Sequence, residues 1–235
     1  FYYSAYDAPK GGVYSEQTQF QKIYYHRIGT PQSADRLVYE DPAHPLRYFW
    51  AWPSEDGEWL FVLASDGTSG TEVLFRKSSG KRFRTLLPGF DADYGVVTVR
   101  DGWLYYVTNR GASNYALRRI DLNDPSKDEV VIPEHDRNLL EGVGTASGYL
   151  FAQYLKDAQS QIAQYDYDGK LVREVALPAI GSVGGFDGEM EYTELYYPLP
   201  NHIQPATTYP THPPPVLPPA YTDPQAPSDP YLSRR

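Results

Sequence analysis

A short pattern recurs four times in this chain of 235 residues. Each copy places a turn that ends in glycine before a strand rich in aromatic residues. The copies are EDGEWLFVLAS (55–65), RDGWLYYVTNR (100–110), ASGYLFAQYLK (146–156) and FDGEMEYTELYY (186–197). Asp-Gly or Ser-Gly between two strands supplies the positive φ of a tight hairpin. The pattern therefore predicts four hairpins, with turns at Gly57, Gly102, Gly148 and Gly188.

Complete units of four predicted strands surround three of these hairpins. One strand precedes each glycine and two follow the aromatic strand, over residues 47–89, 93–134 and 139–178. Four short antiparallel strands that repeat every roughly 40 to 50 residues are typical of the blades of a β-propeller. A sandwich with evenly spaced hairpins is the alternative, but it has no reason to repeat four strands in one order. No stretch has the apolar spacing of a helix, so the sequence predicts an all-β fold.

Incomplete blades flank the complete ones. Three strands are predicted ahead of them, at 1–6, 22–28 and 36–40, and two behind them, GSVGGF (181–186) and YTELYY (192–197). A propeller closes by joining its last blade to its first, usually with about 4–8 blades. The sequence thus predicts a partial β-propeller domain over residues 1–197, with about three full blades and two partial ones.

The segment 198–235 has a different composition, with more than half of the 21 prolines of the chain. Proline removes a donor from a β-ladder and cannot occupy a central strand, so we expect disordered coil or polyproline II there. Two explanations stay open. We favour an out-of-frame or truncated end, because the break falls in the middle of a blade. The other is a ligand segment, in which Pro218-Pro219-Ala220-Tyr221 fits the motif bound by WW domains.

Three long stretches carry a resemblance to a known family. They are TNRGASNYALRRIDLNDP (108–125), VIPEHDRNLLEGV (131–143) and QKIYYHRIGTPQSADRLVYED (21–41). They resemble the N-terminal β-propeller domain of the prolyl oligopeptidase family, serine peptidases that cut short peptides after proline. One departure lies in SDGTSGTEVLF (65–75), where relatives often have Asp-Pro and this chain has Ser69-Gly70.

The resemblance implies a two-domain enzyme. Its seven-bladed propeller would cap an α/β-hydrolase domain that holds the catalytic Ser, Asp and His, and would admit only oligopeptides. The implied partners are the chain's own hydrolase domain and proline-containing oligopeptides. This chain would be the substrate-gating part, without catalysis of its own. The alternative is a stand-alone propeller-like module that binds proteins and carries a proline-rich ligand tail.

The residues present predict no catalytic or metal site. A hydrolase nucleophile needs Gly-x-Ser-x-Gly between a strand and a helix, and the serines of GTSGT (67–71) and GSVGG (181–185) do not fit that spacing. His26 and His135 are explained by packing or capping, and no histidine pair has metal-ligand spacing. Asp91 and Asp93 fall in a turn, where short carboxylates cap backbone amides. We expect no cofactor and no metal.

Asn109 and Arg110 are the weak candidates for substrate binding. They are predicted at the end of a strand, where a loop of a propeller faces its partner domain or the central channel, and functional loops gather at such ends. An arginine that hydrogen-bonds a neighbouring blade is the alternative explanation, and we favour it.

Charge and composition restrict the partners. The net charge of −9 argues against nucleic acid and against an anionic membrane surface, since both require a basic face. The absence of cysteine excludes disulfides and thiol chemistry but does not choose a compartment. No apolar run approaches the length of a membrane span. We expect a cytoplasmic protein, with the periplasm as the alternative.

Overall fold

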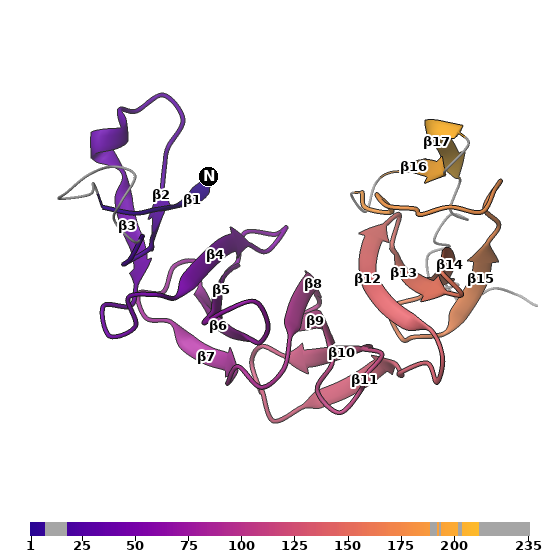
Figure 1. Ribbon diagram of the computed structural model, residues 1–235. Coiled ribbons are helices and arrows are strands. Elements are labelled where there is room, and N and C mark those ends of the chain that lie inside the picture. The colour runs from indigo at the N-terminus through magenta and orange to yellow at the C-terminus, as the bar shows by residue number, and fades with distance from the viewer. Residues whose placement is uncertain (8–17, 189–191, 193, 202–203, 212–235) are drawn as a thin grey trace, which may run out of the picture.

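The computed structural model describes residues 1–7, 18–188, 192, 194–201 and 204–211. These residues form five antiparallel sheets that follow one another along an open arc (Figure 1). The order of the strands in each sheet is the order of the sequence, so every connection within a sheet is a hairpin. The predicted all-β fold with repeated four-stranded sheets is confirmed. No helix among the described residues is long and apolar enough to cross a membrane.

Three of the sheets are complete blades of four strands. The first consists of β4 (Tyr48–Pro53), β5 (Trp59–Ser65), β6 (Thr71–Lys77) and β7 (Arg84–Leu87). The second consists of β8 (Tyr94–Arg100), β9 (Trp103–Thr108), β10 (Ala116–Asp121) and β11 (Asp128–Ile132). The third consists of β12 (Leu139–Ala146), β13 (Tyr149–Lys156), β14 (Gln159–Tyr165) and β15 (Leu171–Val175).

Smaller sheets lie at the two ends of the arc. The β1–β3 sheet contains β1 (Tyr2–Ala5), β2 (Lys22–Tyr25) and β3 (Arg36–Glu40), with a 3₁₀ turn, η1 (Gln32–Ala34), before β3. The other end is a two-stranded hairpin of β16 (Leu195–Asn201) and β17 (Gln204–Thr211). In Figure 1 the first strands of the three blades, β4, β8 and β12, lie on the inner side of the arc, and β7, β11 and β15 lie toward its outside.

The second strand of each blade is buried on both of its faces. In β9, Leu104 and Tyr106 pack into the core against the preceding blade. Tyr105 and Val107 alternate with them and pack into the core against the following blade. Successive side chains of a strand point to opposite faces, so a continuous apolar run contributes to two interfaces at once. This explains why the repeated strands lack the polar alternation of a half-exposed sheet. The interface between two neighbouring sheets is here called a seam.

The hairpin turns follow the prediction at three of four glycines. Gly57, Gly102 and Gly148 adopt φ of +70°, +80° and +76° between the first and second strands of their blades. Gly188 was predicted to be the fourth, and this is wrong, because its φ lies outside the left-handed region. Its amide instead donates to the carbonyl of Thr145 in β12, which draws this segment against the preceding blade.

The last sheet differs from the sequence prediction at both of its ends. GSVGGF is not a strand; it crosses the edge of the preceding blade and buries Val183 and Phe186 in the core shared with the hairpin. The β-pairing also passes residue 197, where we expected the propeller to end, and continues to Thr211. The prolines of β16 are tolerated because a two-stranded hairpin has only edge strands. Residues 212–235, the main part of the proline-rich tail, lie outside the described residues.

Candidate functional site

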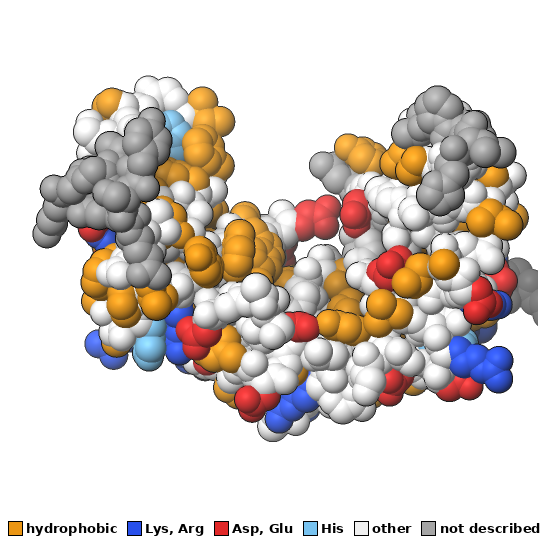
Figure 2. All heavy atoms as spheres, in the orientation of Figure 1, with side chains coloured by type: hydrophobic (Ala, Val, Ile, Leu, Met, Phe, Trp, Pro, Cys, Tyr) orange, Lys and Arg blue, Asp and Glu red, His pale blue; other side chains and the backbone are white. Residues whose placement is uncertain are grey.

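The inner strand β4 presents a row of aromatic side chains. Phe49 and Ala51 turn to the core shared with the β1–β3 sheet. Tyr48, Trp50 and Trp52 alternate with them and therefore face the β8 side. The side chain of Trp50 is 50% exposed and that of Tyr48 is 44% exposed. Hydrophobic side chains gather over this limb of the arc beside the central hollow (Figure 2). The row, here called the aromatic row (Tyr48, Trp50, Trp52), forms one wall of the hollow.

A cavity of about 250 Å³ lies at the end of this row, between β4 and β8. Trp52 and Phe61 form one wall, and their rings are stacked with centroids 6.4 Å apart. Val97 and Val99 form part of the other wall. The carboxylate-bearing residue at its edge is Glu55, from the turn between β4 and β5. The sequence analysis did not single out any of these residues as a site.

A second cavity, of about 330 Å³, follows between β8 and β12. Its lining is largely apolar, with Val97 and Val143 from the two inner strands, and it also includes Asp93, Tyr115 and Glu141. Both cavities along the inner surface of the arc thus combine valine and aromatic side chains with acidic residues.

Asn109 binds a neighbouring loop of its own blade and does not stand free in the hollow. Its Oδ1 accepts the amide of Asp93 at 2.8 Å, and its Nδ2 donates to Asp93 Oδ2 at 3.2 Å. Asp93 is the centre of this contact, because it also accepts the hydroxyl of Tyr115 at 2.7 Å and the amide of Gly70 at 2.7 Å. The bond to Gly70 crosses to the preceding blade. Because the carboxylate of Asp93 accepts a backbone amide, it has the amide-capping role that was predicted for it.

Arg110 follows Asn109 but contributes less to this contact. Its side chain is exposed, and its Nη1 donates to the hydroxyl of Tyr94 at 3.4 Å, within the same blade. Both residues were weak candidates for substrate binding, and a hydrogen bond from the arginine to a neighbouring blade was the favoured alternative. That alternative is wrong for Arg110, whose side-chain hydrogen bond goes to Tyr94 of its own blade. The structure separates them: Asn109 supports the link between blades through Asp93, and Arg110 lies at its margin.

The departure at Ser69-Gly70 belongs to the same junction. Gly70 has φ +78°, and a Cβ atom there would lie 1.9 Å from the carbonyl oxygen of Phe90. Next to it, Thr71 Oγ1 accepts the amide of Tyr94 at 2.7 Å and donates to its carbonyl at 3.2 Å. Only glycine fits this close approach, so the loop joins the β4–β7 blade to the β8–β11 blade.

A charged contact also links the second and third blades on the outer strands. Arg119 of β10 pairs with Glu129 at 2.9 Å and with Asp168 of the following blade at 3.2 Å. Its guanidinium lies 4.9 Å above the ring centroid of Trp103. Hydrogen bonding with Tyr105 is the main reason that the pKa of Arg119 lies above its ordinary value.

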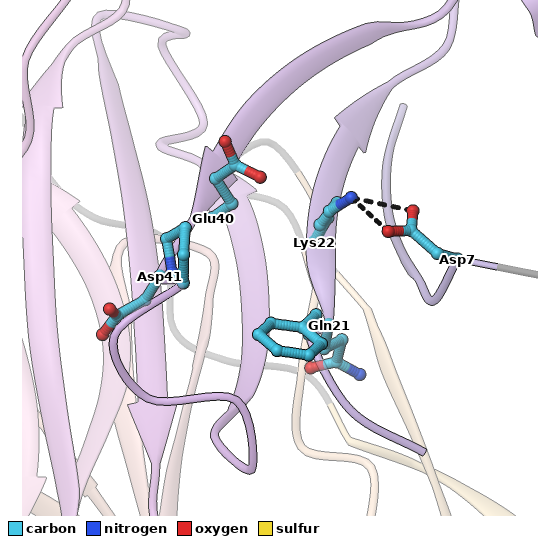
Figure 3. A pocket seen from close by; sticks show the side chains of 7 residues that line it. Asp7, Gln21, Lys22, Glu40 and Asp41 are labelled. Atoms are coloured by element: carbon cyan, nitrogen blue, oxygen red, sulfur yellow. Dashed lines mark hydrogen bonds and ion pairs between the residues drawn. The ribbon is translucent and has the colours of Figure 1, made fainter. Parts of the chain in front are cut away.

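A small pocket of about 220 Å³ lies on the β1–β3 sheet (Figure 3). Its Lys22 points to Asp7, and the Nζ atom lies 2.6 Å from the carboxylate. Glu40, on the paired strand β3, lines the same pocket. The hydrogen bond with Asp7 is the main reason that the pKa of Lys22 is raised. Lys22 is thus paired with Asp7, and the other charged residues that line the pocket, Glu40 and Asp41, are acidic.

The histidines at positions 26, 44 and 135, which are those among the described residues, have structural partners. His26 Nδ1 lies 2.7 Å from Asp35 Oδ1, and the hydroxyl of Tyr3 donates to Asp35 Oδ2 at 2.6 Å. This contact holds η1 against the β1–β3 sheet. His135 Nδ1 accepts the amides of Arg137 and Asn138, both at 3.1 Å, so it caps a turn as expected. Among the described residues, no group of three or more His, Asp or Glu could hold a metal ion.

The fold and the sequence are similar to those of known proteins. The family model described as "Prolyl oligopeptidase, N-terminal beta-propeller domain" matches residues 1–214. The chain belongs to this family. The resemblance inferred from the three long stretches is thus confirmed.

The chain matches one part of relatives that are longer than it is. The prolyl endopeptidases of Elizabethkingia miricola and Elizabethkingia meningoseptica are each 38% identical over 213 residues, which cover 89% of this chain and 30% of the relative. A solved structure from a study of inter-domain dynamics in two prolyl endopeptidases has a TM-score of 0.84 and 29% identity, over 90% of this chain and 32% of that one.

A fungal relative has also been solved with peptides. Prolyl oligopeptidase B from Galerina marginata, in its apo form, superposes with a TM-score of 0.82 and 25% identity, over 90% of this chain and 30% of that one. The same fungal protein has been determined with a 35-residue hydrolysis and macrocyclization substrate. The present chain spans about a third or less of the length of these relatives, namely their propeller portion.

Proposed function

We propose that the chain is the substrate-admitting propeller of a serine peptidase that hydrolyses oligopeptides after proline. The family match over residues 1–214 carries this proposal. The relatives that are 38% identical are both prolyl endopeptidases. In the proposal, a catalytic hydrolase domain is the partner, and the chemistry of acyl transfer takes place on that domain.

The geometry of the arc supports a gating role. The inner strands of three consecutive blades line one hollow, and apolar cavities follow their seams. An extended peptide is one residue wide, whereas a folded domain of about 100 residues has a radius of gyration of about 13 Å. A hollow with fixed walls therefore admits chains according to their width, and it does not need specific contacts with each residue of the peptide.

The walls are fixed by the junctions between blades. Each seam has its own buried core, and the first seam between complete blades is also closed by the Asp93 contact. Because packed cores resist deformation, the arc can hold its inner surface in place while a peptide passes. In the proposal, this chain supplies access, and the hydrolase domain supplies the catalytic residues.

A domain exchange tests the proposal. The segment of the Elizabethkingia meningoseptica prolyl endopeptidase that matches residues 1–211 is replaced by that of this chain. We expect the chimera to cleave a proline-containing dipeptide reporter and to leave a folded protein with an exposed proline loop intact. The same folded protein, denatured and digested to peptides, serves as the positive control.

Two results would contradict the proposal. One is a folded chimera that cleaves native protein and peptide at equal rates, because the propeller would then not select by width. The other is hydrolysis of the reporter by the purified 235-residue chain alone, because the reaction would then reside in the propeller.

A further inference from the structure

We propose that the cavity between β4 and β8 is a subsite for the positively charged end of a proline-containing peptide in the hollow. The occupant is an ammonium group beside a proline, held by the carboxylate of Glu55 and by the ring of Trp52. This inference rests on the proposed function, since it names the place in the hollow where the peptide is held and the charge that is preferred.

The cavity has the size and the walls for such a group. Its volume of about 250 Å³ is far more than the roughly 10–15 Å³ that one water molecule requires. Trp52, Phe61, Val97 and Val99 give it apolar walls, polar groups line the rest of its surface, and Glu55 adds one carboxylate. An aromatic face beside a carboxylate suits a cation that carries an apolar neighbour, because both the ring and the carboxylate attract positive charge.

The turn that carries Glu55 is held by several hydrogen bonds. Asp56 Oδ1 accepts the hydroxyl of Ser54 at 2.5 Å and the amide of Glu58 at 2.9 Å. The hydroxyl of Ser54 in turn accepts the amide of Trp59 at 3.0 Å. These bonds engage Asp56 within the turn. Glu55 is the carboxylate of this turn that lines the cavity, and it has no hydrogen bond or ion pair to the described residues.

The charges around the cavity leave Glu55 free for a ligand. Arg100, at the end of β8, is engaged by other groups, because its guanidinium lies 4.1 Å above the ring centroid of Tyr167 and 3.4 Å from the carboxylate of Asp101. The chain as a whole carries a net charge of −9, which favours the approach of cationic peptides over anionic ones. The charge complementarity therefore selects a positively charged peptide end as the occupant.

The aromatic row extends the subsite along the hollow. Trp50 and Trp52 are two residues apart on one face of β4, which separates them by about 6–7 Å. A polyproline II peptide advances about 3.1 Å per residue, so residues two apart in the peptide have about the same spacing as the two rings. Proline-rich segments dock on exposed aromatic rings of this kind because little conformational entropy is lost. The row would thus hold the proline-containing part, and Glu55 its charged end.

Direct binding to the full 235-residue chain tests the inference. Isothermal titration is carried out with a six-residue peptide that has proline as its second residue, in three forms: with a free amino terminus, with an acetylated terminus, and acetylated with lysine as the first residue. We expect the free form to bind about two- to fivefold more tightly than the acetylated form, which is the range for a solvent-accessible ion pair. Recovery of affinity by the lysine form would show that a side-chain cation can serve as well.

Two variants and a matched control make the test specific. Glu55→Gln is expected to remove the difference between free and acetylated peptides. Glu58→Gln, an exposed carboxylate of the same turn that does not line the cavity, is expected to keep it. Trp52→Phe, which keeps a ring in place but attracts a cation less strongly, is expected to weaken the free and lysine forms more than the acetylated form.

The outcome that overturns the inference is clear. If the free and acetylated peptides bind equally, or if Glu55→Gln keeps the preference, the cavity is not a cation subsite. Because Glu55 lies on an exposed turn, its substitution does not disturb the core, and the test does not depend on a destabilised variant. A chimera that works as a gated peptidase while Glu55 has no effect would refute the subsite alone, whereas an ungated chimera would refute the proposed function.

Discussion

The three complete blades and the β1–β3 sheet use the same kind of strand but differ in how many neighbours they have. In the β8–β11 blade, Leu104 and Tyr105 are adjacent residues of one strand, and both are buried, in different seams. In the β1–β3 sheet, Ile23 is buried against the β4–β7 blade, but Phe1 and Leu37 are 61% and 48% exposed. A blade is therefore stabilised on both faces only when it lies between two others.

The difference shows that the seam, and not the blade, is the unit of stability. Each core of the arc is built from two neighbouring sheets, so a sheet at the end of the arc contributes to one core only. In repeat architectures the stability is approximately a sum of such nearest-neighbour terms. We therefore expect substitutions in the middle of the arc to cost more than equivalent substitutions at its ends, and three predictions test this.

The largest effect is expected for Phe61→Ala. Phe61 is fully buried in the seam between the β4–β7 and β8–β11 blades and stacks on Trp52. Removing such a ring leaves a cavity and costs about 3–5 kcal/mol of the free energy of unfolding. Urea unfolding followed by circular dichroism measures the loss. Phe1→Ala, at the exposed end of the arc, is the matched control and should change the free energy by less than about 0.5 kcal/mol; equal losses would contradict the seam argument.

A smaller effect is expected for Asp93→Ala, which removes the polar link between two complete blades. The carboxylate accepts hydrogen bonds from Gly70, Asn109 and Tyr115. Hydrogen bonds to charged groups contribute roughly 1.5–3 kcal/mol each and are not additive, so we expect a total loss of about 2–3 kcal/mol. The pKa of Tyr115, raised mainly by its bond to Asp93, should fall toward its ordinary value in a spectrophotometric titration.

The control for this substitution lies two residues away. Asp91→Ala removes an exposed carboxylate of the same turn and should change the stability by no more than about 0.5 kcal/mol. If both variants lose the same stability, the turn and not the Asp93 contact joins the blades.

The smallest and most local effect is expected at the β1–β3 sheet when the pH falls. The pKa of Asp35 lies below its usual range, mainly because the hydroxyl of Tyr3 donates to it and also because of His26. A carboxylate with a lowered pKa stabilises the fold above its unfolded value of about 3.9 and loses this contribution as the pH falls through the folded value. Below pH about 4 the NMR signals of Tyr3 and His26 should therefore change before those of the complete blades.

Two variants delimit this pH effect. Asp35→Asn should remove the early transition, because no carboxylate is left to titrate between Tyr3 and His26. Glu40→Gln, an exposed position on the same sheet, should keep it. A transition that is simultaneous in all sheets would show that the β1–β3 sheet does not unfold on its own.

Much of the fold follows from local sequence. The Asp-Gly and Ser-Gly turns at residues 57, 102 and 148 and the apolar strands after them predict the three complete blades, and their turns have the expected positive φ. The fourth turn failed because Gly188 approaches Thr145, a contact with another blade. The end of the last sheet was also missed, because prolines that exclude a central strand are accepted in the edge strands β16 and β17.

The candidate site was less accessible from the sequence. The letters of RYFWAWP show that Tyr48, Trp50 and Trp52 share one side of a strand, but not that this side borders the hollow. Asp93 could be read as a turn residue, but its bond to Gly70 depends on the approach of two blades. Asn109 drew attention as a strand-end residue, and only the neighbouring loop shows that its amide is already engaged.

The sequence by itself therefore determined the strands and turns of the three complete blades, the number of these blades and the family, because these depend on residues close together in the chain. The tertiary structure decided which face of each strand is buried, which carboxylates are bonded, and where cavities remain. Those properties arise between residues of different blades, such as Trp52, Val97 and Thr145 around one cavity. Their distances are set by the packing of whole sheets, which no local pattern records.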